Sequence, residues 1–221
     1  MSITTKPKAI VIGGGATGCG VGRDLILRGF DVTLIEYGDL GSGTSSRFHG
    51  MLQSGARYVV SDPDYAAECY GERLIIARLA PDVVEQTGGL FVSLPSDPAD
   101  FSDKFFEQCK VAGIPSEELD PDQIMLEEPV INREVQRAFS VPDATVQSWR
   151  LVNLLADDIR HYGGAVLARH QVTRIDVQNG KVKGVDVTSA NGTQHIPADI
   201  IVNSAGPWSG RVAAMVGEDA D

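Results

Sequence analysis

A glycine-rich loop near the amino terminus constrains the fold of this chain more than any other feature. The apolar run KAIVI at 8–12 opens directly into GGGATGCG, in which Gly13, Gly15 and Gly18 have the G-x-G-x-x-G spacing. A segment with helical apolar spacing follows, and then a second apolar strand, DVTLIE, which ends in Glu36. This order predicts a β-α-β unit with parallel strands and a right-handed crossover: a strand, a glycine loop, a helix, a second strand and an acid.

Each part of this unit has a physical role in binding a dinucleotide. Gly13 permits the tight turn, Gly15 lets the backbone approach a pyrophosphate, and Gly18 lets the helix pack on the strand. The helix N-terminus presents N–H groups and partial positive charge to the phosphates. Glu36 would accept hydrogen bonds from the adenosine ribose, and it disfavours NADP, whose 2′-phosphate it would repel. The alternative, a glycine-rich turn beside a solvated glutamate, explains this ordered context less well.

The residues after Glu36 favour FAD over a nicotinamide cofactor. A nicotinamide domain usually continues with further β-α units, whereas this chain runs into GDLGSGTSSRFHG, whose small hydroxyl residues could line a second stretch of dinucleotide. The apolar strand in ADIIVNSAGPWSG, at 198–210, ends in small residues. Such a strand end would let a cofactor pass close to the backbone at the carboxyl edge of the sheet.

Beyond the first unit, the pattern predicts a second region and then a return to the first. We expect helices over 62–80, 100–113, 120–129 and 148–164, and strands over 89–94 and 137–142. From residue 165 the runs become strand-like, and Asn179-Gly180 and Asn191-Gly192 are strong hairpin turns between them.

The predicted fold class is therefore α/β, with a Rossmann-like nucleotide domain and a second region. We place the nucleotide domain at 1–45 plus 146–221, including a β-meander at about 165–197, and a helix-rich insertion at 46–145. Apolar stripes predict the buried side chains of two helices: Phe101, Phe105, Cys109 and Val111 in one, and Leu151, Leu154, Leu155 and Ile159 in the other. Trp149 and Trp208 are expected to be packing anchors.

Composition excludes several classes of function. The chain carries 30 acidic and 19 basic residues, a net charge of −11, which argues against nucleic acid as a partner. Cys19, Cys69 and Cys109 are scattered, and the four histidines are isolated, so we expect neither a disulfide framework nor a metal site. No apolar run approaches the length of a membrane span, and the N-terminus lacks the pattern of a signal peptide. These features predict a cytoplasmic location.

Residues 46–58, SRFHGMLQSGARY, concentrate scarce cationic and titratable side chains in an acidic chain. Bound anions in such a protein need local donors, and arginine supplies a rigid bidentate fork. Arg57 could therefore bind an anion, or it could pair with a surface acid. His49 could be a general base or could brace the loop, and Tyr58 could donate a hydrogen bond or be a core residue.

The motifs together resemble the FAD-dependent glycerol-3-phosphate dehydrogenases, within the D-amino-acid-oxidase-like group. The likeness is strongest to the large (A) subunit of the anaerobic bacterial enzymes, and its segments are VIGGGATGCGVGRDLILRG, HGMLQSGARY, GLFVSLP, VPDATVQSWRL and IIVNSAGPWS. The resemblance implies a glutathione-reductase-type FAD domain with the start of an antiparallel substrate domain. It also implies oxidation of sn-glycerol 3-phosphate to dihydroxyacetone phosphate, with electrons passed to quinone. Partner subunits would hold such a protein at the inner face of the cytoplasmic membrane.

Matching positions carry over the site residues of this group. The implied FAD contacts are Gly13, Gly14, Gly15, Ala16, Thr17, Gly18, Glu36, Thr44, Ser45, Ser46, Arg47, His49, Gly50, Val172, Ala205, Gly206 and Trp208. Val172 would contact adenine through its backbone. The implied catalytic residues are His49, Arg57 and Tyr58, with His49 taking the hydroxyl proton and Arg57 and Tyr58 at the substrate phosphate or hydroxyl. No metal is implied.

Two departures from the group keep other functions open. Gln53 stands where the large chain of the anaerobic enzymes usually has a second histidine. Proteins of this group are also much longer, and their later substrate-domain strands, the basic residues that complete the phosphate pocket and the final glycine-rich segment have no counterpart here. The alternatives are an FAD-dependent 2-hydroxy-acid dehydrogenase or amino-acid oxidase, and an inactive truncated FAD-binding remnant.

Overall fold

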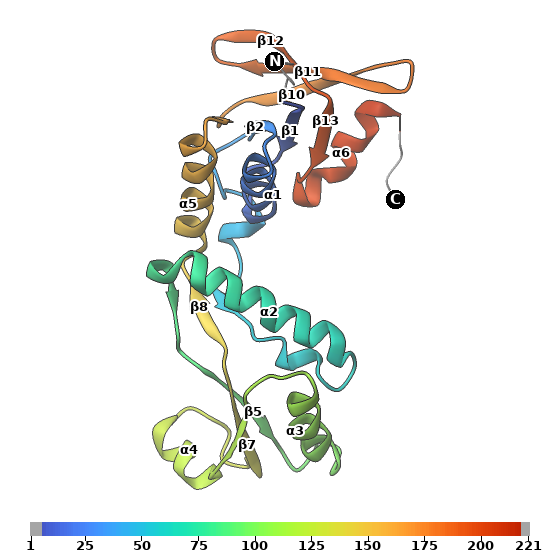
Figure 1. Cartoon of the computed structure of the whole chain (residues 1–221). Helices are drawn as coiled ribbons and strands as arrows, with labels where there is room; N and C mark the ends of the chain where they lie inside the picture. The colour runs from blue at the N-terminus through green and yellow to red at the C-terminus, as the bar shows by residue number, and fades with distance from the viewer. Residues whose placement is uncertain (1–5, 218–221) are drawn as a thin grey trace. The chain divides into compact units, whose positions relative to one another are not determined.

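The computed structural model describes residues 6–217 and divides into two compact units (Figure 1). The first unit comprises the chain up to His49 and again from Ser148, and the second comprises Gly50–Gln147. The first boundary thus lies at residue 49 where we expected 45, and the chain returns at 148 where we expected 146. Residues 1–5 and 218–221 of the expected first domain lie outside the described residues.

The first unit is built on a four-stranded parallel sheet. Its elements are β1 (Lys8–Ile12), α1 (Ala16–Leu27), β2 (Asp31–Ile35), α5 (Ser148–His161), β9 (Ala165–Leu167), β10 (Gln171–Gln178), β11 (Lys181–Ser189), β12 (Gly192–Pro197), β13 (Ile200–Asn203) and α6 (Ser209–Ala213). The strand order is β13-β1-β2-β9, and every neighbouring pair is parallel. This arrangement confirms the predicted α/β class.

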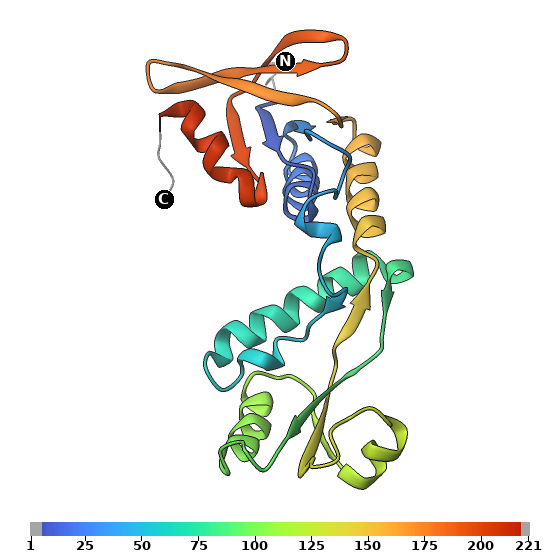
Figure 2. The ribbon, with the colours of Figure 1, turned by 180° about the vertical axis from the view of Figure 1, so that it is seen from behind.

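Alternating side chains of the sheet are buried on its two faces. Ile10, Ile12 and Ile35 share one apolar cluster with β10, β11 and Val212 of α6. On the other face, α1 lies beside α5, as Figures 1 and 2 both show. The two helices approach closely because Gly22 has no side chain: a Cβ there would lie 2.7 Å from Ile159 Cδ1.

The predicted meander needs one correction. Residues 165–167 do not begin it; they form β9, which pairs with β2 in the parallel sheet. The meander is β10-β11-β12, which starts at Gln171. The sequence of a short apolar run can predict that it is a strand. It cannot predict which sheet the strand joins, because the pairing partner lies far away in the chain.

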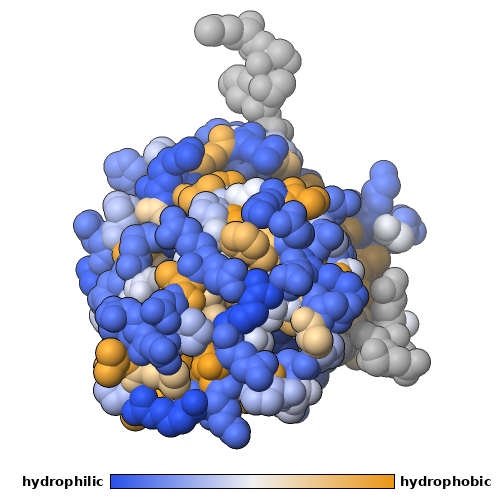
Figure 3. All heavy atoms as spheres, turned by 90° about the horizontal axis from the view of Figure 1, so that it is seen from below, coloured by the Kyte–Doolittle hydropathy of each residue, from blue (hydrophilic) through white to orange (hydrophobic). Residues whose placement is uncertain are grey.

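The second unit contains two small antiparallel sheets and three helices. Its elements are β3 (Met51–Leu52), α2 (Pro63–Leu79), β4 (Val84–Glu85), β5 (Gly89–Ser93), α3 (Phe101–Val111), β6 (Glu117–Leu119), α4 (Pro121–Glu127), β7 (Arg137–Val141) and β8 (Ala144–Val146). The sheets have the orders β3-β8-β4 and β5-β7-β6. Viewed from the side of α3 and α4, the surface is mostly hydrophilic with scattered apolar residues (Figure 3).

Aspartate-proline pairs begin two of these helices. The Asp62 side chain accepts a hydrogen bond from the Tyr65 N–H at 3.0 Å, and Pro63 is the first residue of α2. Asp120 caps α4 in the same way through the Asp122 N–H. Aspartate at the N-cap satisfies a backbone donor, and proline at the next position lacks the donor that would need one. The start predicted for α2 is confirmed.

The predicted core is correct in part. In α3, Phe105 and Cys109 are buried, but Phe101 is half exposed and Val111 is 71% exposed. Val111 follows Cys109 by two residues, about 200° around the helix, and so points away from the buried stripe. In α5, Leu151, Leu155 and Ile159 are buried as expected, Leu154 is half-buried, and Val152 and Ala156 are buried in addition. Trp149 is 60% exposed and is no packing anchor within the described chain.

Candidate functional site

The loop between β1 and α1 packs so tightly against the first turn of α1 that only glycine fits at one position in each. Gly13 has φ +112°, and a Cβ there would lie 2.3 Å from the Ser204 carbonyl oxygen. A Cβ on Gly18 would lie 1.8 Å from the carbonyl oxygen of Gly13. The loop therefore packs between the first turn of α1 and the turn that follows β13, at the carboxyl edge of the sheet.

The start of α1 presents backbone N–H groups that have no acceptor among the described residues. The first intrahelical hydrogen bond runs from the Cys19 N–H to the Gly15 carbonyl at 2.9 Å, and the Ala16 N–H donates to Ser45 Oγ at 2.9 Å. Within residues 6–217, the N–H groups of Gly15, Thr17 and Gly18 donate to no protein acceptor. The first turn also contains no acidic residue. These donors and the helix dipole fit an anion such as a pyrophosphate.

Glu36 lies beside this loop and connects its parts. Its Oε2 accepts a hydrogen bond from the Gly14 N–H, and its Oε1 accepts one from the Gly38 N–H, each at 2.7 Å. Each carboxylate oxygen has a second lone pair, so both can still accept hydrogen bonds from ribose hydroxyls. Glu36 thus both fixes the loop and offers acceptors next to the unpaired donors of α1.

The hydroxyl-rich stretch after β2 folds back onto the same loop. The Gly41 N–H donates to the Gly14 carbonyl at 2.9 Å, and residues Thr44–Ser46 form a 3₁₀ turn whose Ser45 reaches α1. Arg47 follows directly, is exposed, and forms no ion pair with the described residues. Thr44 and Ser46 are also exposed.

The turn after β13 completes this constellation. Gly206 has φ +56°, and the Trp208 N–H donates to the Ala205 carbonyl at 3.1 Å. The Trp208 ring covers Gly43, where a Cβ would lie 3.3 Å from Trp208 Cζ3. Three segments that are far apart in sequence, 13–18, 41–47 and 204–208, therefore meet at one edge of the sheet. They have the donors and the close backbone approach that a dinucleotide requires.

Val172 lies on the Glu36 side of the same region. It is buried in β10, which is an edge strand of its sheet. Two residues earlier, the His170 N–H donates to the Glu36 carbonyl at 2.9 Å. A neighbouring pair was not foreseen: Arg169 Nε donates to Asp39 Oδ1 at 2.8 Å, and this bond holds the pKa of Asp39 below its usual range.

Cys19 lies in α1 next to the glycine loop, and its thiol is unreactive near neutral pH. Its side chain is fully buried, and burial raises the pKa of the thiol to about 12, with a smaller contribution from the negative charge of Glu36. A thiol with so high a pKa is neither a nucleophile nor a metal ligand near neutral pH. No group of three or more potential metal-binding side chains occurs in the part of the chain that the structure describes.

The expected catalytic residues lie in both units. His49 belongs to the first unit, is exposed, and its ring centroid is 5.5 Å from that of Phe48; Gly50 begins the second unit with φ +80°. Arg57 and Tyr58 lie in a 3₁₀ turn, Ala56–Tyr58, of the second unit. That His49 and this turn serve one site stays a prediction.

Arg57 and Tyr58 differ in their surroundings. Arg57 is exposed and forms no ion pair with any residue in 6–217, so the alternative of a surface salt bridge is not observed there. The Tyr58 ring is partly buried, packs against the cluster that contains Phe105, and meets the Tyr65 ring edge-on at 5.1 Å. Arg57 is therefore available to an anion, while the ring of Tyr58 is part of the core.

Two hollows of the described chain lie away from the glycine loop. One, of about 290 Å³, is lined by aromatic side chains of the second unit, among them Phe91, Phe101 and Phe105. The other, of about 330 Å³, lies near Lys8 and Asp31, at the amino-terminal ends of β1 and β2. Neither includes the glycine loop.

Among residues 6–217, no helix is both long and apolar enough to cross a bilayer.

A parallel sheet with this loop and a glutamate after β2 defines a dinucleotide-binding protein. The family model described as FAD dependent oxidoreductase (DAO) matches residues 8–221, so the chain belongs to this family, and FAD is its cofactor. The unpaired N–H groups at the start of α1 and the acceptors of Glu36 fit such a group.

Known proteins place the chain more closely within the family. It is 40% identical to the A1 subunit of the anaerobic glycerol-3-phosphate dehydrogenase of Haloferax volcanii, over 98% of this chain and 39% of that protein. It is 42% identical to the A subunit of the Escherichia coli K12 enzyme, over 92% of this chain and 38% of that protein. The chain thus spans about two fifths of the length of these relatives.

The fold agrees with that of a glycerol-3-phosphate dehydrogenase of known structure. The glycerol-3-phosphate dehydrogenase of Bacillus halodurans, solved in complex with FAD, superposes with a TM-score of 0.71 at 23% identity, over 96% of this chain and 36% of that one. At this identity the likeness establishes the fold. The chain is thus a homologue of the A subunits of anaerobic glycerol-3-phosphate dehydrogenases, with the fold of an FAD-binding oxidoreductase.

Proposed function

We propose that this chain forms the FAD-binding part of an enzyme that oxidises sn-glycerol 3-phosphate to dihydroxyacetone phosphate. The observation that supports this most strongly is the identity of 40–42% to the A subunits of two anaerobic glycerol-3-phosphate dehydrogenases, over nearly the whole chain. The electrons would pass to quinone through partner subunits at the inner face of the cytoplasmic membrane.

In this proposal, residues of the first unit make all but one of the contacts with the cofactor, and Gly50 is the exception. Gly13 to Gly18 and the start of α1 bind the pyrophosphate, Glu36 binds the ribose, and the backbone of Val172 contacts adenine. The further contacts come from the two flanking segments: Thr44, Ser45, Ser46, Arg47, His49 and Gly50, and Ala205, Gly206 and Trp208. Support comes from the unpaired donors of α1 and from the meeting of these segments at one sheet edge.

The substrate chemistry assigns three further roles. FAD, when bound, supplies the acceptor for the hydride that leaves C2. His49 takes the proton of the C2 hydroxyl, Tyr58 donates a hydrogen bond to the same oxygen, and Arg57 binds the phosphate group. A charge-assisted pair between guanidinium and phosphate has the geometry and strength that this last role needs. The guanidinium of Arg57 supports it, because it is exposed and forms no ion pair with residues 6–217.

Dye reduction by the complete polypeptide tests the substrate assignment. We expect glycerol 3-phosphate to be oxidised, and glycerol, 2-hydroxy acids and amino acids to react poorly. Faster turnover of a 2-hydroxy acid or an amino acid would support the alternative flavoenzymes instead. We expect the 221 residues alone to turn over poorly or not at all, and robust dye reduction by this segment would contradict that part.

A further inference from the structure

A buried carboxylate lies directly behind the turn that carries Arg57. Asp143 is 6% exposed and Ser54 is fully buried. Asp143 Oδ1 accepts two hydrogen bonds from Ser54, from the N–H at 2.7 Å and from the Oγ hydroxyl at 2.6 Å. Both residues belong to the second unit, although 89 positions separate them.

The contact continues from Ser54 into the 3₁₀ turn. Ser54 Oγ accepts a hydrogen bond from the Ala56 N–H, at 3.4 Å, and Ala56 is the first residue of the turn that contains Arg57 and Tyr58. Ser54 stands one residue before Gly55, the N-cap of this turn, so its hydroxyl links the first N–H of the turn to the carboxylate. Asp143 thus orients the hydroxyl that contacts the turn.

Close packing leaves Asp143 and the turn little freedom. Gly55, between Ser54 and Ala56, has φ +86°, and a Cβ there would lie 2.4 Å from the Ala66 carbonyl oxygen of α2. On the other side, a Cβ on Gly89 would lie 2.9 Å from Asp143 Oδ2. The turn is therefore held between α2 and the Asp143 carboxylate.

We propose that Asp143 is a positioning residue for the substrate, which acts through Ser54 to fix the turn that presents Arg57. The proposal rests on the proposed function, in which Arg57 binds the substrate phosphate. Asp143 itself touches neither substrate nor cofactor in this account. Its effect is to order the Arg57 backbone before the anion arrives, so that less conformational entropy is lost on binding.

Kinetics of the complete polypeptide test this proposal. We expect D143A and S54A to raise KM for glycerol 3-phosphate about tenfold, with kcat changed less than about twofold. D143N should restore most of the affinity, because its amide oxygen can still accept from both donors of Ser54. D97A is the control for loss of an exposed carboxylate that also accepts from a backbone N–H: Asp97 accepts from the Leu94 N–H in the same unit, at 2.8 Å, and its loss should leave KM unchanged.

A double-mutant cycle separates positioning from general destabilisation. If Asp143 acts through Arg57, the R57A/D143A protein should be no worse than R57A alone, because the group that Asp143 positions is already absent. Additive effects on KM would overturn the proposal, and so would D143N behaving like D143A.

Amide hydrogen exchange in the 221-residue chain gives a readout that does not depend on turnover. We expect faster exchange at Ser54 and Ala56 in D143A, normal exchange in D143N, and no change around Gly13–Gly18 in either. Unchanged exchange at Ser54 and Ala56 in D143A would refute the anchoring. If the complete wild-type polypeptide fails to oxidise glycerol 3-phosphate, the proposed function fails, and this measurement still decides whether Asp143 holds the turn.

Discussion

The two units offer donors for anions in different ways. In the first unit the donors are backbone N–H groups at the start of α1, and glycines with no room for a side chain hold them in place. In the second unit the donor is one exposed side chain, Arg57, on a short turn. A backbone site fails when its glycines change, whereas a side-chain site fails when its charge is removed. Substitutions of the glycines and removal of the Arg57 charge should therefore have effects that differ in magnitude and in the ligand whose binding they weaken.

The largest effect should come from Gly18→Ala. Its Cβ would lie 1.8 Å from a backbone carbonyl oxygen, so the loop or the helix must move, and overpacking of this kind costs about 1–3 kcal/mol or more. We expect FAD affinity to fall at least about 100-fold, measured by titration with FAD.

Gly20→Ala is the matched control for this variant. Gly20 lies in the same helix, and nothing lies within 4 Å of a Cβ built there. We expect G20A to bind FAD normally and to gain up to about 1 kcal/mol of unfolding free energy, because alanine is the better helix former. If both variants bound FAD as tightly as wild type, the steric account of the loop would be wrong.

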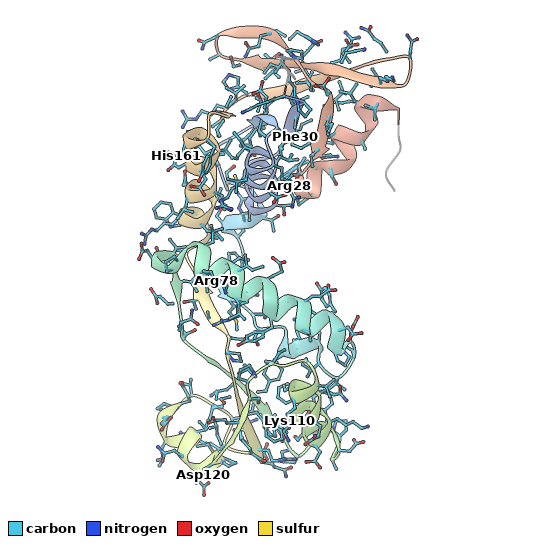
Figure 4. All side chains as sticks on the ribbon, in the orientation of Figure 1. Arg28, Phe30, Arg78, Lys110, Asp120 and His161 are labelled. Atoms are coloured by element: carbon cyan, nitrogen blue, oxygen red, sulfur yellow. The ribbon has the colours of Figure 1, made fainter. Side chains whose placement is uncertain are left out.

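The next largest effect should come from Arg57→Ala in the complete polypeptide. Loss of a charge-assisted hydrogen bond of about 2–3 kcal/mol should raise KM for glycerol 3-phosphate about 30- to 150-fold, and KM for glycerol far less. Arg78→Ala, on the exposed side of α2 (Figure 4), changes the net charge equally and should leave both constants near wild type. An equal rise for both substrates would remove Arg57 from the phosphate role.

A smaller effect is expected for Glu36→Gln. The amide keeps one oxygen for the Gly14 or Gly38 N–H and for ribose, but it loses the charge and the other acceptor. We expect FAD affinity to fall about tenfold, which corresponds to about 1.4 kcal/mol, with KM ratios between substrates unchanged. If E36Q bound FAD with wild-type affinity, Glu36 would stabilise the loop through its hydrogen bonds without contributing to FAD binding.

The smallest effect should come from Arg73 in α2, a buried cation. It is 5% exposed, its Nε has no hydrogen-bond partner in the described chain, and its Nη2 donates to Gln86 Oε1. Removing a poorly compensated buried charge is often stabilising. We expect Arg73→Met to raise the unfolding free energy of the 221-residue chain by about 1 kcal/mol in urea titration, while exposed Arg78→Met stays within about 0.5 kcal/mol of wild type. A large loss in R73M would mean that Arg73 has a partner that this account lacks.

The first unit could be predicted further from sequence than the second, for a physical reason. The strand, glycine loop and helix are close in sequence, and glycine is required there by local steric limits, so its spacing alone indicates the site. The sheet that β9 joins could not be predicted in this way. Nor could β3, β4, β6 and β8, because strands of two or three residues leave no periodic pattern.

Several side-chain contacts of the candidate site were also beyond sequence reasoning. Asp39 and Arg169 are 130 positions apart, and Ser54 and Asp143 are 89 apart. Their pairing depends on how distant segments pack, and nothing in the local residue pattern marks one acid among 30 as the partner. Val111 shows the same limit within one helix. An apolar residue of a helix is buried only if its position around the helix axis places it on the face that packs against the core.

Calorimetric titration of the 221-residue chain with FAD and with riboflavin tests the central claim most directly. If the unpaired N–H groups of α1 bind the diphosphate and Glu36 binds the adjoining ribose, FAD should bind at least about 100-fold more tightly than riboflavin, which lacks both groups. Equal affinity for the two ligands, or no binding of FAD by the folded chain, would contradict it.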